Sequence, residues 1–407
     1  MGASFSRRGS TTPSLEYVPD DALAEMLLRV PPHPACLLHA SLVSRHLRRV
    51  IAGPNFLRAF RERHRRAPPL LGFFHDDSSL PHSFLPVGDS PDRVSAAAFD
   101  PKEHGWRVVD SRHGRVLLQS PDRLRLLVWD PMAGGRRRYI DPPPLQTVLH
   151  YEFTGAAVVC AAGHGEDHGD CHDSPFRVVF VATLGRGKKA LVYVYSSELG
   201  LWDEVASGDL APLLITERPP VLLRNVLYWT MAMEFQHSIL AFNLETHELY
   251  LINQPVYMFD AGHEHVQVRE APAEGGGMLG IVAACGLKLQ LWTLQAYNGK
   301  GTEQWVNEGE IDLDDLALVE PMYQDYHIDL DEDYHMIWIL GVEGSVAFVR
   351  TEAGIFEVDL KTSVSKRICD GNDIQTFYPY RSFFPARVRL TPEMEEMDRT
   401  GLKTCAD

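Results

Sequence analysis

Four side chains of the type that bind zinc lie close together in the stretch GHGEDHGDCHD. His164, His168, Cys171 and His172 fall within nine residues, and imidazole and thiolate are ligands that zinc prefers. No second pair of such ligands lies nearby in the sequence, and the glycines leave the stretch without a defined conformation. We therefore interpret 163–175 as a hydrophilic insertion between two strands, with the four residues as a secondary metal candidate. We expect no metal and no cofactor.

The other chemical motifs each lack a residue that their chemistry needs. GRGKK at 185–189 resembles a phosphate-binding loop but ends in lysine, where Ser or Thr must hold magnesium. Asp329, Asp331 and Asp333 have calcium-loop spacing, but Tyr334 stands where the loop needs its turn glycine. No G-x-S-x-G nucleophile motif occurs in the sequence. The chain is therefore predicted to supply no catalytic side chain.

From residue 70 onward the sequence repeats a strand, a polar turn and a second strand. The recurring strand endings LLVWD, LVYVYS, ILAFN, LQLWT and GIFEVD follow one another at intervals of 47 to 66 residues. Their last residues are Asp130, Ser196, Asn243, Thr293 and Asp359. A polar turn-former that closes a β-branched or aromatic run is typical of a hairpin. A repeat of about 40 to 50 residues made of short strands indicates a β-propeller blade.

The pattern predicts a propeller over 70–390 and a polar tail over 391–407, but leaves the number of blades open. Further blades are expected from Leu70–Phe74, Tyr323–Asp333 and Phe377–Arg389. The aromatic residues near the C-terminus predict that the terminal strands pair and close the ring, because an open ring leaves an exposed edge. A β-sandwich or a pair of barrels is the alternative, and one recurrent hairpin over more than 300 residues favours the propeller.

The N-terminal part, 14–66, reads instead as short helices with clear stop signals. Leu23, Met26, Leu27 and Val30 share one helical face after Pro19. A second helix is expected after Pro34, with Leu37 and Leu38, and a third over Val43, Leu47, Val50 and Ile51, ending at Gly53-Pro54. A unit this small buries little apolar area, so we expect it to complete its core on a partner. An ordinary helical subdomain packed on the rest of the chain is the alternative.

The helical segment resembles an F-box, the motif that binds the Skp-type adaptor of cullin-RING ubiquitin ligases. The positions that match the family pattern are Val18-Pro19-Asp20, Leu23, Glu25-Met26-Leu27, Arg29-Val30-Pro31, Leu37-Leu38, Val43-Ser44, Arg48, Val50-Ile51, Pro54 and Phe56. Leu47 stands where the family has tryptophan, and His39 where it has arginine. The order of an F-box followed by a kelch-like or F-box-associated propeller is similar to that of a large plant family, in particular its grass members.

The resemblance implies a small all-α module followed by an all-β propeller, and it implies the surface that binds the adaptor. The residues it assigns to that surface are Val18, Pro19, Leu23, Leu27, Pro31, Leu37, Leu38, Val43, Leu47, Val50 and Ile51. On this interpretation the chain is the substrate-recognition subunit of an SCF-type ubiquitin ligase, with partners that are the adaptor, through it a cullin, and an unknown target. The alternatives are a propeller scaffold that acts outside ubiquitination and a glycan-binding propeller.

Charge and targeting signals limit the remaining classes. The chain carries a net charge of −16, but residues 1–66 hold 11 Arg against 5 acidic residues, so the remainder is at −22. This argues against nucleic-acid binding by the propeller and suits an acidic partner for the helices. Scattered cysteines and the absence of a signal-peptide pattern predict a nuclear or cytoplasmic protein. The leader, 1–13, is expected to be disordered, and Gly2 fits a myristoylation pattern.

Overall fold

The computed structural model describes most of the chain. The described residues are 18–64, 68–77, 83–88, 93–123, 125–133, 135–144, 153–161, 171–172, 174–184, 188–209, 214–233, 236–255, 266–272, 277–297, 302–316, 337–369 and 374–383. They fall into two compact units. The helical unit takes the described residues of Met1–Pro69, Gly88–Arg93 and Phe383–Asp407, and the propeller unit takes those of Leu70–Val87 and Val94–Ser382. The leader with Gly2 and the tail from 391 lie outside the described residues.

Prolines and acidic residues mark where helices of the helical unit begin, but the first helix ends at Leu27, before Val30 of the predicted face. Within the described residues its helices are α1 (Asp20–Leu27), α2 (Pro34–Val43), α3 (Arg45–Ile51) and α4 (Pro54–His64). Pro34 and Pro54 stand at first helical positions, where the missing N–H is not needed. Asp20 and Asp21 lie in the first turn of α1, where the helix dipole favours negative charge.

The prediction that Val43 begins the third helical face is wrong. Ser44 is extended, with φ −155° and ψ 154°, and its side chain accepts a hydrogen bond from the Leu47 N–H at 3.1 Å. Ser44 therefore caps α3, and Val43 is the last residue of α2. Leu47, Val50 and Ile51 are buried, but Val43 is 67% exposed.

The core of the helical unit is completed by this chain itself. Phe56 and Phe60 on α4 join the buried residues of α1 to α3, and Phe383 packs into the same cluster. The cluster consists of Leu23, Leu27, Leu37, Leu47, Val50, Ile51, Phe56, Phe60 and Phe383. Residues of the chain thus supply apolar contacts that were expected from a partner.

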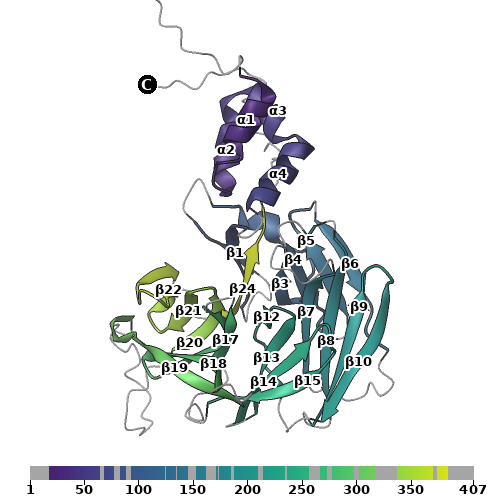
Figure 1. Ribbon diagram of the computed structural model, residues 1–407, viewed down its shortest axis with the longest axis vertical. Helices are drawn as coiled ribbons and strands as arrows, with labels where there is room; N and C mark the ends of the chain where they lie inside the picture. The colour runs from purple at the N-terminus through teal and green to yellow at the C-terminus, as the bar shows by residue number, and fades with distance from the viewer. Residues whose placement is uncertain are drawn as a thin grey trace, which may run out of the picture. The chain divides into compact units, whose positions relative to one another are not determined.

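In the described part of the propeller unit the strands form six sheets, which are its blades (Figure 1). Blade 1 is β3 (Arg107–Arg112), β4 (Arg115–Gln119), β5 (Leu126–Asp130) and β6 (Arg136–Ile140); blade 2 is β7 (Phe153–Cys160), β8 (Phe176–Leu184), β9 (Lys189–Ser196) and β10 (Leu201–Asp209). Blade 3 is β11 (Leu214–Ile215), β12 (Val221–Leu223), β13 (Val226–Met233), β14 (Gln236–Asn243) and β15 (Leu249–Asn253).

The remaining blades include the one that joins both ends of the unit. Blade 4 is β16 (Val266–Ala271), β17 (Met278–Cys285), β18 (Lys288–Tyr297) and β19 (Thr302–Asp312); blade 5 is β20 (Trp338–Glu343), β21 (Val346–Thr351), β22 (Gly354–Asp359) and β23 (Ser365–Cys369). Blade 6 is β24 (Ile374–Arg381), β1 (Leu70–Asp77) and β2 (Ser83–Pro86). Two 3₁₀ turns, Ala96–Phe99 and Asp314–Leu316, complete the described elements.

The blades form a closed ring. Inner strands of successive blades contact each other in the order β3, β7, β11, then β12 with β16, then β20, β24 and back to β3. The closing pair is antiparallel, with Leu70 opposite Arg381 and Phe74 opposite Tyr378. Figure 1 shows β24, in yellow, beside the blue β1. The prediction that the terminal strands close the ring is confirmed, and the described ring has six blades rather than a sandwich or two barrels.

The recurring strand endings are the third strands of five blades, and in four of these blades the last residue caps the following turn. Oδ1 of Asp130 accepts the Ala133 N–H at 2.9 Å, and Ser196 Oγ accepts the Leu199 N–H at 3.3 Å. Asn243 and Asp359 cap their turns in the same way. The fifth prediction is wrong, because β18 continues past Thr293 to Tyr297 and leaves Thr293 buried in mid-strand.

The propeller core lies between blades. Separate clusters of buried aliphatic and aromatic residues join blades 1 and 2, 2 and 3, 3 and 4, 4 and 5, and 5 and 6. Trp129, Trp229 and Trp292 are buried and belong to the core. Strands inside a blade are apolar on both faces, because a blade lies between two others. The outer strand β6 is exposed except at its last residue.

Candidate functional site

The predicted adaptor-binding residues divide into a buried set and an exposed set. Pro19, Pro31 and Val43 are exposed, and Val18 is half-buried. The side chain of Leu38 lies outside the described structure. The buried members are Leu23, Leu27, Leu37, Leu47, Val50 and Ile51, each at most 9% exposed. The buried set therefore holds the helical unit together, and a docking protein would meet the exposed set first.

The described surface of the helical unit combines two exposed apolar side chains with arginines. Met26 is 63% exposed and Val43 is 67% exposed, whereas side chains of this size are usually buried. Arg45 and Arg49 are exposed as well. Asp20 pairs with His46 at 2.5 Å, and this hydrogen bond holds the pKa of the Asp20 carboxyl below its usual range. Such a surface suits a partner that is apolar and acidic.

The zinc-type candidates do not form a described metal centre. His164 and His168 lie outside the described residues. Cys171 is buried, and its carbonyl oxygen accepts a hydrogen bond from Arg115. Within the described residues no group of three or more His, Cys, Asp or Glu side chains is placed to hold a metal ion. Residues 185–187 and 329–333 of the rejected motifs also lie outside the described part.

His172 is engaged in hydrogen bonds that fasten β24 to blade 1. Its Nδ1 lies 2.7 Å from Asp130 Oδ2, and its Nε2 lies 3.2 Å from Ser382 Oγ. The order Asp–His–Ser is that of a hydrolase triad. Ser382 is only 3% exposed, however, and a Cβ at Gly114 would lie 2.7 Å from His172 Cε1. The imidazole ring of His172 packs tightly against the Gly114 backbone and leaves no room for a substrate. The hydrogen bonds of His172 therefore serve to position the C-terminal strand.

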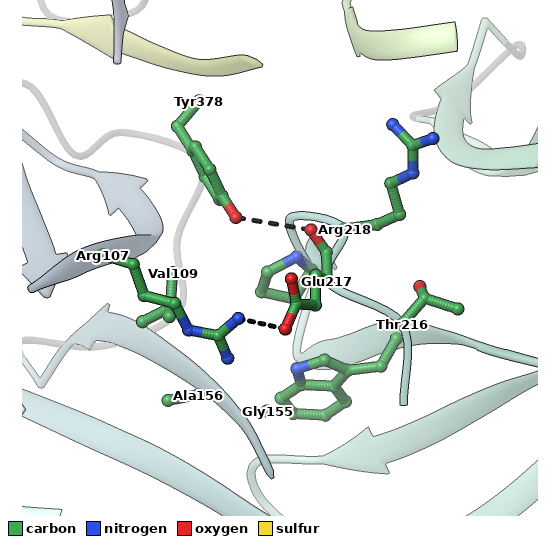
Figure 2. Close-up of a pocket in the computed structure, with 10 residues that line it drawn as sticks. Arg107, Val109, Gly155, Ala156, Thr216, Glu217, Arg218 and Tyr378 are labelled. Atoms are coloured by element: carbon green, nitrogen blue, oxygen red, sulfur yellow. Dashed lines mark hydrogen bonds and ion pairs between the residues drawn. The ribbon is translucent and has the colours of Figure 1, made fainter. Parts of the chain in front are cut away.

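A cavity in the middle of the ring brings together side chains from four blades (Figure 2). The inner strand of blade 3 is interrupted, because β11 and β12 both pair with β13 and Thr216–Pro220 runs between them. We call Thr216–Pro220 the channel segment. Besides that segment, the lining residues are Arg107 and Val109 of β3, Gly155 and Ala156 of β7, Trp229 of β13 and Tyr378 of β24.

The channel segment presents a carboxylate to two guanidinium groups. Glu217 Oε1 accepts a hydrogen bond from Arg107 Nη1 and lies 2.9 Å from Arg123 Nη2. Figure 2 shows Arg107 and Tyr378 reaching Glu217 from different sides. The side chain of Glu217 is 54% exposed, against 20% for Arg107 and 43% for Arg123. The cluster therefore lies where solvent reaches it and has one more positive than negative charge.

Hydrogen bonds of its carbonyls and of the Arg218 side chain hold the channel segment independently of that carboxylate. The Glu217 carbonyl accepts the Thr376 hydroxyl at 3.4 Å and the Tyr378 hydroxyl at 3.5 Å. Arg112 donates to the Pro220 carbonyl at 2.6 Å. Arg218, 9% exposed, donates to the Gln375 carbonyl at 3.1 Å and to that of Ile339. The segment is thereby tied to blades 1, 5 and 6.

The buried carboxylate of Asp110 supports one of the arginines that hold the channel segment. Asp110 is 1% exposed, accepts the Val158 N–H at 2.8 Å and pairs with Arg112 at 3.1 Å. Burial raises the pKa of the Asp110 carboxyl, and Arg112 opposes that shift. Through these bonds Asp110 joins blade 1 to blade 2 and orients the guanidinium that holds Pro220.

The cavity itself is small. The centre of a water molecule can occupy about 20 Å³ of it, which is room for one or two waters. Trp229 is 1% exposed, and its indole N–H has no hydrogen-bond partner among the described residues, so a water in the cavity would satisfy it. Pockets for metabolites are more than tenfold larger, so the cavity as it stands suits water rather than a substrate.

Sequence reasoning missed the arginine–carboxylate cluster. Its members come from β3, the β4–β5 turn and the channel segment, and no local spacing links them. One signal was present: RVVDSR at 107–112 places three charged residues in a strand pattern. Charged side chains in a buried strand need oppositely charged or hydrogen-bonding partners.

No helix in the part of the chain that the structure describes is long and apolar enough to cross a membrane.

Comparisons with known proteins give structural likenesses of low identity. No protein-family model matches the chain, and no curated protein matches it. Among solved structures, a nidogen/laminin complex matches with a TM-score of 0.42 and 11% identity, over 75% of this chain and 95% of that one. Sqt1 of Saccharomyces cerevisiae matches with 0.37 and 12%, over 76% and 90%. The β-propeller domain of the trilobed protease from Pyrococcus furiosus matches with 0.27 and 11%, over 63% and 80%.

Proposed function

We propose that this chain is a protein-interaction receptor: the helical unit docks on a Skp-type adaptor, and the propeller holds a target for ubiquitination by an SCF-type ligase. The chain supplies no catalytic side chain in this proposal. It acts by tethering, because holding a target beside the charged ubiquitin-conjugating enzyme raises the effective concentration of the target's lysines.

The observation that carries the proposal is a helical unit with its own core and an apolar, basic surface. Leu23 and Leu47 are buried within the unit. The core of the unit is therefore formed without its exposed residues, which stay available for a partner. Met26 and Val43 remain exposed, and the F-box resemblance assigns Val43 to adaptor contacts. The net charge of +6 over residues 1–66 suits an acidic adaptor.

The test is co-purification of the full chain with a Skp-type adaptor. Met26→Glu with Val43→Glu places two carboxylates against the acidic partner, and we expect binding to fall at least about tenfold, the effect of losing roughly 1.4 kcal/mol. The matched control is Leu199→Glu with Leu201→Glu on the propeller, where the side chains are 71% and 64% exposed. The control should bind like the unaltered chain.

Substitutions in the buried set answer a different question. Leu23→Arg would place a charge in the core of the helical unit, where Leu23 is 2% exposed, and would unfold the unit. Loss of binding by that variant would not identify a contact surface. The exposed pair is therefore the decisive change.

The outcomes separate the proposal from its alternatives. If Met26→Glu with Val43→Glu leaves adaptor binding unchanged, this docking surface is wrong. If the unaltered chain binds no Skp-type adaptor, the ubiquitin-ligase role fails and a propeller scaffold outside ubiquitination remains. Retention on immobilised glycans, without adaptor binding, would instead favour the glycan-binding alternative.

A further inference from the structure

We infer that Arg107 and Arg123 form a recognition site for a carboxylate in an acidic segment of the target protein, and that Glu217 occupies this site as an internal stand-in. The identity of the ligand as a target protein rests on the proposed function. The site itself rests on the geometry of Arg107, Arg123 and Glu217, two of which line the cavity.

The first observation is that two guanidinium groups from different parts of blade 1 converge on one carboxylate oxygen. Arg107 comes from β3 and Arg123 from the β4–β5 turn, and both bond Glu217 Oε1. Arginine forks suit carboxylates and phosphates alike. The group already seated there is a carboxylate, which favours a carboxylate ligand.

The second observation is that Gln119 supports both arginines, through the guanidinium of Arg107 and through the main chain of Arg123. The amide oxygen of Gln119 accepts Nη2 and Nε of Arg107 at 3.0 and 3.3 Å, and Gln119 is 1% exposed. The amide nitrogen of Gln119 donates to the Arg123 carbonyl at 2.9 Å. Gln119 thus positions the Arg107 guanidinium directly and fixes the main chain at Arg123 before any ligand arrives, which lowers the entropy lost on binding.

The third observation is an unusual backbone conformation at Arg123. Its φ is 61°, a left-handed value that is uncommon for a residue other than glycine. The turn enforces it, because the Arg123 N–H donates to the Ser120 carbonyl at 2.8 Å, and Ser120 Oγ accepts the Arg125 N–H at 2.9 Å. Conformations of this kind gather at ligand sites, where the surrounding structure holds them.

The fourth observation is that Glu217 can leave without loss of the channel segment. The segment is held through the carbonyls of Glu217 and Pro220 and through the Arg218 side chain. The Glu217 carboxylate, at 54% exposure, contributes two ion pairs that solvent reaches, and such pairs are weak. A carboxylate from a partner can therefore replace it at little cost and restore the same charge balance.

The test selects peptides from a randomised display library on the purified full chain. Peptides enriched on the unaltered chain should carry Asp or Glu, and Glu217→Gln should enrich the same peptides more strongly because the internal competitor is gone. A selected peptide should bind Arg107→Gln with Arg123→Gln about tenfold or more weakly, as expected when charge-assisted hydrogen bonds are lost. Its affinity should also fall as salt rises.

A matched control removes the same charge elsewhere. Lys361→Gln with Lys366→Gln changes two exposed lysines of blade 5 and should leave peptide binding unchanged. Arg123→Gln alone keeps the test valid if the double arginine variant folds poorly, because its side chain is 43% exposed. The inference is overturned if acidic peptides are not enriched, or if they bind the arginine variants and the unaltered chain equally.

The selection uses no adaptor, so the two proposals fail separately. Enrichment of acidic peptides by a chain that binds no Skp-type adaptor would leave the carboxylate site standing and remove the ligase role. Adaptor binding without acidic enrichment would do the reverse.

Discussion

Blades 1 to 5 and blade 6 are both antiparallel sheets, but their strands come together in different ways. In blade 1, β3 to β6 follow one another along the chain, and each strand pairs with the next. In blade 6, β24 from the far end of the propeller pairs with β1, and Leu70 lies opposite Arg381. Short turns set the register in the first case, whereas no local connection can do so in the second.

Aromatic packing supplies what blade 6 lacks in local connection. Phe73 stacks on Phe377 with ring centroids 4.9 Å apart, and Phe74 meets Tyr380 edge-on at 5.6 Å. Phe73, Phe74, Phe377 and Tyr380 are each at most 1% exposed. Bulky rings bury much area and have preferred geometries, so they both stabilise the closing pair and fix its register.

The largest effect should come from removing the closing strand. A chain that ends at Asp373 lacks β24 and leaves the edge of β1 unpaired. We expect loss of the cooperative thermal transition and aggregation, as measured by calorimetry and light scattering. A chain that ends at Leu390 is the control and should melt like the full chain. Similar melting of both truncated chains would contradict a closed ring.

Phe383→Ala should destabilise the helical unit and leave the stability of the propeller unit unchanged. Phe383 lies two residues after β24 but packs in the helical core. Truncating a buried phenylalanine costs about 3–5 kcal/mol, which is a large share of the stability of a small unit. Amide hydrogen exchange should be faster in α1 to α4, and its rate in the strands should be unchanged.

Phe377→Ala is the mirror control, because Phe377 packs between blades 5 and 6. It should destabilise the strands and spare the helices. The comparison fails if both variants affect both units alike.

Loss of one turn cap should have a smaller effect. Asn243→Ala or Asp359→Ala removes an acceptor for two backbone N–H groups. We expect Asn243→Ala to lower the free energy of unfolding by about 1 kcal/mol, and Asp359→Ala to lower it as well, both measured in urea. Lys361→Ala is the control, because it keeps the main-chain N–H that donates to Asp359. An equal loss in the control would show that the caps do not matter.

The smallest effect concerns pH. Hydrogen bonds from the Thr362 and Lys361 N–H groups hold the pKa of the Asp359 carboxyl below its usual 3.8. A carboxylate with a depressed pKa in the folded state stabilises fully above 3.8, and this contribution is lost as pH falls through the folded value. Asp359→Asn keeps the acceptor, as Asn243 does in blade 3. In urea titrations, the stability of the unaltered chain relative to Asp359→Asn should therefore be lower at pH 3 than at pH 7. A constant difference would contradict the assignment.

Local sequence predicted the hairpins well because their determinants are local. A β-branched or aromatic run followed by a capping residue marked the third strands of blades 1, 2, 3 and 5. The same rule failed at Thr293, where a β-branched residue continues the strand. Helical periodicity failed at Val43, because Ser44 caps α3, which begins at Arg45.

What the sequence by itself determined is the order of a helical part before a propeller, the hairpin repeats and the closing role of the aromatic C-terminal strand. Only the tertiary structure decided the number of blades, because blade 6 takes strands from both ends. It also decided that Leu23 and Leu47 face the core of the helical unit, with Phe383 among them. Arg107, Arg123 and Glu217 meet only in the folded ring. Contacts between residues far apart in the chain carry no local signature, because folding rather than spacing brings them together.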